Sequence, residues 1–265
     1  MITRFAPSPT GYLHLGHAAA AVKAFGFSKS HDGQCLLRIE DIDHTRCRQK
    51  YTAAIYEDLS WLGFDWPKPA RIQSEHLSAY ADTLENLKAR GLAYACFKSR
   101  KELALSGASA PLSEDEVQSR ITDGETPAWR LSLTVAREIL GVKIGALSYR
   151  EHGKIQTTNV DFGDVILARK DIGISYHLAC CHDDAAQNIT DIVRGSDLAE
   201  QTGVHVLLQN LMGWPTPRYH HHGLILRGDG QKLSKRTGGA AIRELRGAGM
   251  TPKAVLDMAK AGICG

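Results

Sequence analysis

Long apolar stretches are missing from this chain of 265 residues, although 43% of them are hydrophobic. No uninterrupted run approaches the roughly 20 apolar residues that cross a bilayer as a helix. The start, Met1 to Arg4 followed by Pro7 and Pro9, also lacks the charged-then-apolar order of a signal peptide. We therefore expect a cytoplasmic monomer without a membrane segment, with enough core for one large domain or two closely packed ones.

Paired cysteines are missing as well. The six cysteines are Cys35, Cys47, Cys96, Cys180, Cys181 and Cys264. None of them forms a Cys-x-x-Cys pair, so the sequence indicates neither a zinc ribbon nor a thioredoxin-like site, and we expect reduced thiols. A strong charge of one sign is also absent, since the net charge is +3 and the pI is near 8.5. This balance is compatible with RNA binding but does not predict it.

Short strands and helices alternate in the first third of the chain. Ile2 to Phe5 reads as a strand, a turn rich in proline follows, and Leu15 to Ser30 has the alanine-rich composition of a buried helix. We expect a second strand at Cys35 to Ile39 and helices over about Gln49 to Leu62 and His76 to Arg90. This alternation is typical of an α/β fold with a parallel, helix-covered sheet.

The pattern changes at about residue 95 and returns after residue 172. Between them, Ser113 and Glu116 have the spacing of a capping box, and Trp129 to Leu131 and Val165 to Ala168 resemble short strands. Four later segments are expected to rejoin the sheet and its helices: Ser175 to Cys180, Ile189 to Arg194, a helix near Asp197 to Met212, and a strand at Gly223 to Arg227. The middle segment is therefore predicted to be an inserted domain.

Two histidines, His14 and His17, lie where a loop after the first strand enters a helix. Backbone N–H groups and the helix dipole at such a point favour an anion such as a triphosphate. Gly16 between them would let a nucleotide approach the backbone, and the imidazoles could donate to phosphate oxygens. The alternative is a helix start with two incidental histidines.

A basic segment with flanking glycines, Lys232-Leu-Ser-Lys-Arg236, follows the last expected strand. Lysines in such a loop suit closure over a polyphosphate, although a solvated basic loop has the same composition. Together with His14-Leu-Gly-His17, this segment resembles the two ATP-binding signatures of class I aminoacyl-tRNA synthetases, HIGH and KMSKS. The stretches RFAPSPTG at 4–11 and RIEDID at 38–43 are similar to the glutamyl branch of that class.

This resemblance implies a Rossmann-like parallel sheet split by an inserted domain. Residues 1–94 and 173–240 would form the two halves of the nucleotide-binding catalytic domain, 95–172 the inserted acceptor (connective) domain, and 241–265 a short helical tail. ATP, accompanied by Mg²⁺, would be bound by His14, Gly16, His17, Lys232, Ser234 and Lys235. Of these, His14, His17 and Lys235 would stabilise the charge that develops during the reaction.

Glutamate carries two carboxylates and one ammonium, so its pocket needs a guanidinium and an acidic group on rigid strand ends. Arg4, Glu40 and Arg194 meet that need. By resemblance, the glutamate-binding set is Arg4, Phe5, Ala6, Pro7, Ser8, Glu40, Tyr176 and Arg194. The alternative is that each charged member makes a structural salt bridge.

Two further expectations, the metal content and the acceptor, come from a comparison of this chain with the short and the full glutamyl enzymes. The short glutamyl-queuosine enzymes often bind zinc in the insert through a Cys-x-Cys pair, but Cys96 is followed by Phe97 and Lys98, so we predict no structural zinc. The chain ends soon after Pro252, whereas full glutamyl synthetases continue into an anticodon-binding part. This layout implies glutamate activation without tRNA and transfer to the queuosine base in the anticodon of tRNA(Asp). A catalytic fragment of a glutamyl-tRNA synthetase that charges tRNA(Glu), and a non-catalytic tRNA-binding module, remain alternatives.

Overall fold

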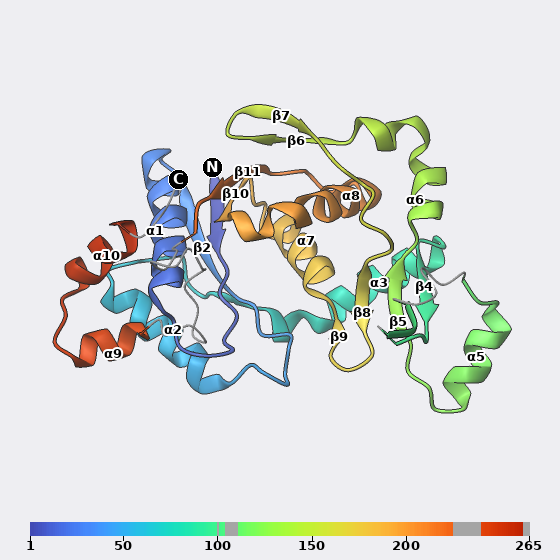
Figure 1. Cartoon of the computed structure of the whole chain (residues 1–265), viewed down its shortest axis with the longest axis horizontal. Helices are drawn as coiled ribbons and strands as arrows, with labels where there is room; N and C mark the ends of the chain where they lie inside the picture. The colour runs from blue at the N-terminus through green and yellow to red at the C-terminus, as the bar shows by residue number, and fades with distance from the viewer. Residues whose placement is uncertain (100, 104–110, 225–239, 262–265) are drawn as a thin grey trace.

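The computed structural model describes residues 1–99, 101–103, 111–224 and 240–261 (Figure 1). Its first elements are β1 (Ile2–Phe5), α1 (Leu15–Ser30), β2 (Gln34–Ile39), α2 (Gln49–Trp61), β3 (Arg71–Ile72), the 3-10 helix η1 (Gln73–His76) and α3 (Leu77–Ala89). Strand β1 pairs in parallel with β2, and β2 in parallel with β3. The predicted alternation of strands and helices is confirmed here, with element ends within about two residues of the expected ones.

The later part of the chain returns to this sheet. It contains β9 (Gly173–Ile174), α7 (Tyr176–Ala186), β10 (Asp191–Gly195), the 3-10 helix η3 (Ser196–Gln201), α8 (Thr202–Met212) and β11 (Arg218–His222). Strand β10 pairs in parallel with β11, and the amide of Thr190, just before β10, donates to the carbonyl of Ile2 in β1 (2.9 Å). The carboxyl ends of β1, β2 and β10 therefore lie together (Figure 1).

Two of the expected segments need comment. Ser175 to Cys180, for which the sequence did not indicate the type of element, is the beginning of α7, with the Ser175 hydroxyl accepting from the amide of Leu178 as the N-cap. The strand expected at Gly223 to Arg227 is not found at its first two residues, because β11 ends at His222; its last three residues lie outside the described residues.

The middle segment forms an antiparallel sheet with an attached hairpin. Its elements are β4 (Ala93–Cys96), α5 (Glu114–Thr122), β5 (Ala128–Leu131), α6 (Leu133–Leu140), the 3-10 helix η2 (Gly141–Ala146), β6 (Ser148–Glu151), β7 (Lys154–Thr157) and β8 (Ile166–Arg169). Strands β4, β5, β8 and β9 are antiparallel neighbours, whereas the β6–β7 hairpin joins β11 through the register pair Tyr219 and Glu151. The hairpin thus links the middle segment to the parallel sheet, and the domain limits at 94/95 and 172/173 stay a prediction.

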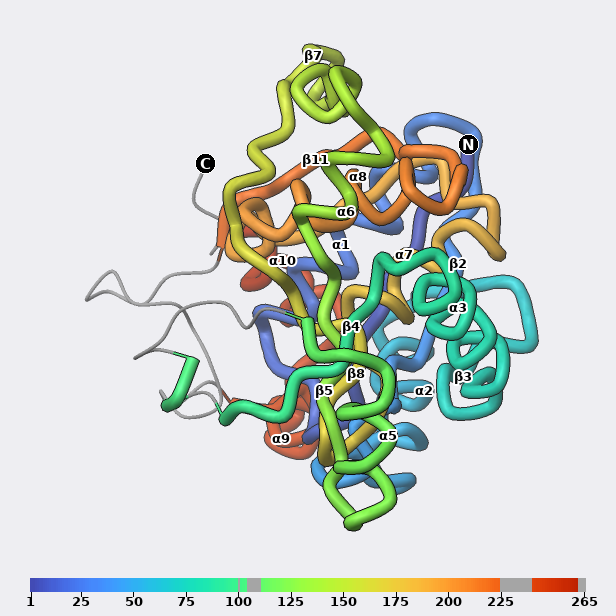
Figure 2. The backbone as a smooth tube through the Cα atoms, turned by 90° about the vertical axis from the view of Figure 1, so that its right-hand side faces the viewer, coloured from blue at the N-terminus to red at the C-terminus, as the bar shows by residue number. Residues whose placement is uncertain are grey.

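Helix α1 is the support of the first half. Its alanines are buried apart from Ala20, which is partly buried, and this lets the sheet on one side and α10 (Pro252–Ala261) on the other approach closely. The chain returns to the amino end of α1 just before α9 (Ile242–Gly247), where the Ile242 amide donates to the Leu13 carbonyl (2.8 Å). Figure 1 shows α9 and α10 on the side of the molecule that carries α1 and α2, which is the far side in Figure 2. No described helix is long and apolar enough to span a membrane.

Candidate active site

A cavity of about 530 Å³ opens at the carboxyl ends of β1, β2 and β10 and at the amino end of α1. Ligands of open parallel sheets bind at this edge. Its lining contains Arg4, Phe5, Ala6, Ser8, His14, Gly16, His17, Glu40, Tyr176 and Arg194 from the predicted set. Pro7 is not in the lining, but its carbonyl accepts the amide of Glu40 (3.1 Å) and so ties the loop after β1 to the end of β2.

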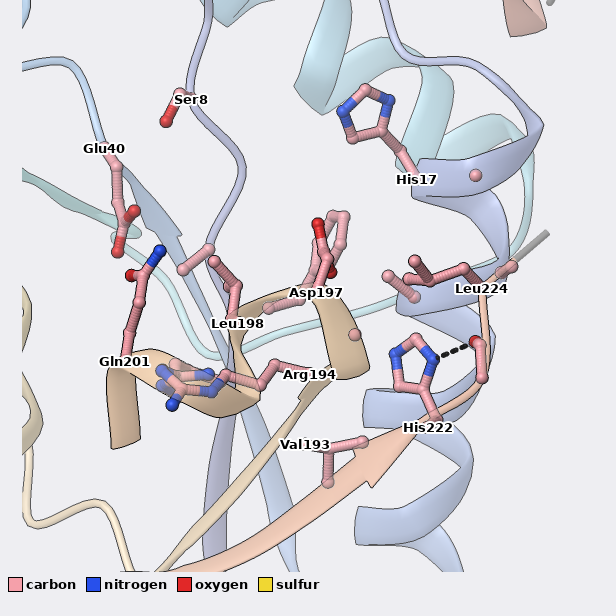
Figure 3. A pocket seen from close by; sticks show the side chains of 18 of the residues that line it. Ser8, His17, Glu40, Val193, Arg194, Asp197, Leu198, Gln201, His222 and Leu224 are labelled. Atoms are coloured by element: carbon pink, nitrogen blue, oxygen red, sulfur yellow. Dashed lines mark hydrogen bonds between the residues drawn. The ribbon is translucent and has the colours of Figure 1, made fainter. Parts of the chain in front are cut away.

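The cavity has two chemically different ends (Figure 3). Glu40, Gln201 and the guanidinium of Arg194 lie toward one end, whereas His17, His222 and Leu224 lie toward the other. The first end offers charged groups for an amino acid. The second end includes the amino terminus of α1, where an anion is stabilised.

His14 and His17 form a reciprocal cap on α1. The Nδ1 of His14 accepts from the Gly16 amide (3.0 Å), and the Nδ1 of His17 accepts from the His14 amide (3.1 Å). A ring nitrogen that accepts a hydrogen bond carries no proton, so each neutral imidazole bears its proton on Nε2. Both rings can therefore donate from Nε2, which is the role that a phosphate requires.

Arg4 lies in a buried network with Arg38 and two carboxylates of α7. The Nε of Arg4 and the Nη2 of Arg38 both donate to Asp184 Oδ1, at 3.0 and 2.8 Å. Asp183 accepts from Arg71, Gln73 and the Tyr80 hydroxyl. Burial opposes ionisation of Asp184, but the two guanidiniums prevail and hold its pKa well below the usual range. The alternative reading of Arg4 as a structural ion pair is therefore partly correct, although its side chain also lines the cavity.

Glu40 follows the end of β2 and is 8% exposed. Its Oε1 lies 3.5 Å from Arg38 Nε. Burial raises the pKa of Glu40 to about 7, even though Arg38 and Arg4 act in the opposite direction. A bound ammonium would favour the carboxylate form, so the site gains negative charge where an amino group would bind.

Arg194, at the end of β10, has a different environment. Its guanidinium donates to His221 Nε2 (3.2 Å), to the Thr202 hydroxyl (2.8 Å) and to His205 Nδ1 (3.3 Å). No carboxylate in the described parts of the chain forms an ion pair with it. Burial first, and Arg194 second, hold the pKa of His205 well below the usual range, so that ring is a neutral acceptor. Arg194 is thus a buried cation, 5% exposed, with neutral partners and one side toward the cavity.

Tyr176, a predicted lining residue, begins α7, and burial raises the pKa of its phenol well above the usual value.

Several other lining residues were not predicted from the sequence. Gln201 and Asp197, on η3, were missed, as was His222 at the end of β11. The carbonyl oxygen of Gln201 is buried and has no hydrogen-bond partner among the described residues, so a donor on a ligand would satisfy it.

Three predicted ATP-binding residues, Lys232, Ser234 and Lys235, lie outside the described residues. In the described ranges, no group of three His, Cys, Asp or Glu side chains could hold a metal ion. Cys96 is buried at the end of β4. The absence of a structural zinc stays a prediction.

Comparisons with known proteins agree with this geometry. The family "tRNA synthetases class I (E and Q), catalytic domain" matches residues 1–262. A glutamyl-Q tRNA(Asp) synthetase from Rhodobacter capsulatus is 42% identical over 95% of this chain and 97% of its own length. A glutamate–tRNA ligase from Ruegeria pomeroyi is 35% identical over 97% of this chain, which spans only 59% of that relative.

A solved structure is also similar. The glutamate–tRNA synthetase of Elizabethkingia anophelis superimposes with a TM-score of 0.77 at 27% identity, over 98% of this chain and 61% of its own. The predicted resemblance and the class I synthetase fold are therefore confirmed. The chain belongs to the class I tRNA synthetases of the glutamyl and glutaminyl (E and Q) family.

Proposed function

We propose that this protein activates L-glutamate with ATP in the absence of tRNA and transfers the glutamate to the queuosine base in the anticodon of tRNA(Asp). The observation that carries the first step is the state of Arg194. A buried guanidinium whose described partners are all neutral binds an incoming carboxylate without first releasing one of the protein's own. Glu40 provides the opposite charge for the ammonium in the same cavity.

The activation step needs positioning and charge stabilisation. An oxygen of the glutamate α-carboxylate attacks the α-phosphorus of ATP, the bond to the β-phosphate bridging oxygen breaks, and pyrophosphate leaves. The Nε2–H groups of His14 and His17, together with the amino end of α1, would donate to oxygens that gain negative charge. From the sequence alone, Gly16, Lys232, Ser234 and Lys235 are proposed to bind the same nucleotide as its Mg²⁺ complex.

In the transfer step, a hydroxyl of the acceptor attacks the carbonyl carbon of the glutamyl-adenylate and AMP leaves. The support for queuosine as the acceptor is the higher identity to the glutamyl-Q tRNA(Asp) synthetase, 42% against 35% for a glutamate–tRNA ligase. Because glutamate–tRNA ligases are also similar, charging of tRNA(Glu) is the second candidate.

Pyrophosphate exchange tests the first step. We expect ATP–pyrophosphate exchange with glutamate and no added tRNA, and little exchange with glutamine, which would leave a guanidinium without its anionic partner. Exchange only after tRNA is added would favour a tRNA(Glu)-charging enzyme. No exchange under either condition would leave a non-catalytic tRNA-binding module.

Nuclease mapping tests the second step. Radiolabelled glutamate should be transferred to tRNA(Asp) that contains queuosine and not to the same tRNA that contains guanine at that position. The label should be found in an anticodon fragment. Label on the 3′-terminal adenosine of tRNA(Glu) would contradict the proposal and establish the second candidate.

A further inference from the structure

Arg194 is held by residues of α8 and β11, and one of these contacts leads to the middle segment of the chain. Its Nε donates to His221 Nε2 (3.2 Å), and His221 belongs to β11. On the far side of the same ring, His221 Nδ1 lies 2.6 Å from Glu151 Oε1, at the end of β6. Glu151 is 70 residues away in sequence, and the backbone register of β6 with β11 brings it here.

The two contacts determine the tautomer of His221. Because Arg194 cannot accept a hydrogen bond, His221 Nε2 must be the acceptor and carries no proton. The proton is then on Nδ1, which donates to the Glu151 carboxylate. Burial also lowers the pKa of His221, which agrees with a neutral ring. Such carboxylate–histidine pairs fix both the tautomer and the ring orientation.

Aromatic and polar contacts fix the geometry further. The rings of His221 and Tyr219 are stacked, with centroids 5.9 Å apart, and the guanidinium carbon of Arg194 lies 5.2 Å from the Tyr219 ring centroid. Tyr149, also on β6, donates to Glu151 Oε2 (3.4 Å). Glu151 is thus an oriented acceptor, and its hydrogen-bonded link to Arg194 passes through the imidazole of His221.

We propose that His221, oriented by Glu151 of the β6–β7 hairpin, is a positioning residue that holds the Arg194 guanidinium ready for the substrate carboxylate. The inference rests on the proposed function, in which Arg194 binds glutamate. Placing a neutral ring between the two charges directs Arg194 without pairing it to Glu151. A direct ion pair would instead have to be broken or shared when glutamate binds.

Substitutions of His221 separate its contact with Glu151 at Nδ1 from its contacts at Nε2, where the Thr202 hydroxyl also lies 3.3 Å away. In His221→Asn, the shorter amide can donate to Glu151 but does not reach Arg194. In His221→Gln, the longer side chain can place an acceptor near the former Nε2 but loses the link to Glu151. His220→Asn is the matched control, since His220 is the preceding residue of β11 and contacts Asp191 instead (2.9 Å).

ATP–pyrophosphate exchange gives the readout, with thermal unfolding as the check that each variant is folded. We expect His221→Asn to raise the KM for glutamate about tenfold or more, the size of losing a hydrogen bond to a charged group. The KM for ATP and kcat should stay within about twofold. His221→Gln should recover part of the loss, Glu151→Gln should raise the KM a few-fold, and His220→Asn should behave as the wild type.

Two results would overturn the inference while leaving the proposed function intact. One is a folded His221→Asn protein with the wild-type KM for glutamate. The other is an equal loss in kcat and in both KM values for His221→Asn and His220→Asn, which would indicate a general structural role. Failure of the wild-type protein itself to exchange with glutamate would instead remove the proposed function, and this inference with it.

Discussion

The cavity contains two buried arginines that differ in their partners. Arg4 shares the Asp184 carboxylate with Arg38, at distances of 3.0 and 2.8 Å. Arg194 is as buried as Arg4 but contacts two neutral imidazoles and a hydroxyl. The charge of Arg4 is therefore largely compensated inside the protein, whereas that of Arg194 is available to a ligand. The comparison shows that a guanidinium in the lining is not by itself a binding group, because its partners decide whether it stabilises the fold or the substrate complex.

The largest effect on stability is expected when the ion pairs of Arg4 and Arg38 with Asp184 are removed. Asp184→Asn keeps the shape of the side chain but leaves Arg4 and Arg38 without their shared counter-charge. Breaking a buried ion pair in this way should lower the free energy of unfolding by about 3–5 kcal/mol. Denaturant unfolding measures it, with Arg194→Met as the comparison. A similar loss of stability in both variants would contradict the distinction between the two arginines.

The same pair predicts how stability depends on pH. The folded protein holds the pKa of Asp184 below its unfolded value, so this stabilisation is present above the unfolded pKa and is lost as the pH falls through the folded one. Asp184→Asn should therefore have a smaller loss of stability in acid than the wild type.

The next largest effect is on the Arg194 side, where activity should fall rather than stability. In Arg194→Met the substrate carboxylate loses its charged partner within a buried site, so kcat/KM for glutamate in pyrophosphate exchange should fall about a hundredfold or more. The KM for ATP should change little. A folded variant with nearly wild-type kcat/KM would show that Arg194 does not bind the substrate.

A third prediction uses the opposite charge, Glu40. Its pKa of about 7 in the empty site means that glutamate, whose ammonium favours the carboxylate, should displace a proton on binding. The affinity should therefore rise as the pH increases through 7, with the KM for glutamate about tenfold lower at pH 8 than at pH 6. Glu40→Gln should bind more weakly and lose this dependence. A wild-type KM that does not change over this range would place the ammonium elsewhere.

The raised pKa of Glu40 also makes the free energy of unfolding depend on pH. The folded state favours protonated Glu40, so the contribution of this group to stability is largest below its unfolded pKa and is lost as the pH rises through about 7. Glu40→Gln should consequently be more stable than the wild type at pH 8, relative to their difference at pH 5. We therefore expect Arg4 to act mainly on stability and Arg194 on substrate binding, and we expect Glu40 to favour binding at the expense of stability at high pH.

Local signals in the sequence were sufficient for the first half of the fold. The proline-rich turn after β1 and the alanine-rich run of α1 gave element ends close to those observed. They did not decide the type of element at α7, because Leu178 to Cys181 is a short apolar run that suits a strand or a buried helix equally. The β6–β7 hairpin was not predicted from the sequence. In the structure, both residues of its two-residue turn, His152 and Gly153, have positive φ.

For the site, the motifs predicted most of the lining but not the partners of each charge. Arg38 and Asp184 are 146 residues apart, and nothing local in the sequence indicates that they meet. An arginine within the apolar strand β2 and two aspartates on a helix with buried cysteines are, however, a signal of buried ion pairs, because such charges are rarely buried without a partner. The difference between Arg4 and Arg194 required the three-dimensional arrangement.

The smallest effect is expected at Gly195, the residue after Arg194 on β10. A Cβ added there would lie 2.5 Å from Asp197 Oδ1 and 2.8 Å from a methyl group of Leu224, both in the cavity lining. These atoms end side chains that can rotate, so Gly195→Ala should change stability little but displace lining groups near the His17 end of the cavity. We expect a few-fold increase in the KM for ATP and a smaller change in the KM for glutamate, because Arg194 itself keeps its three partners. Pyrophosphate exchange with each substrate varied in turn measures both values. A larger increase for glutamate than for ATP would mean that the methyl group disturbs Arg194 first, and the two ends of the cavity would then not be independent.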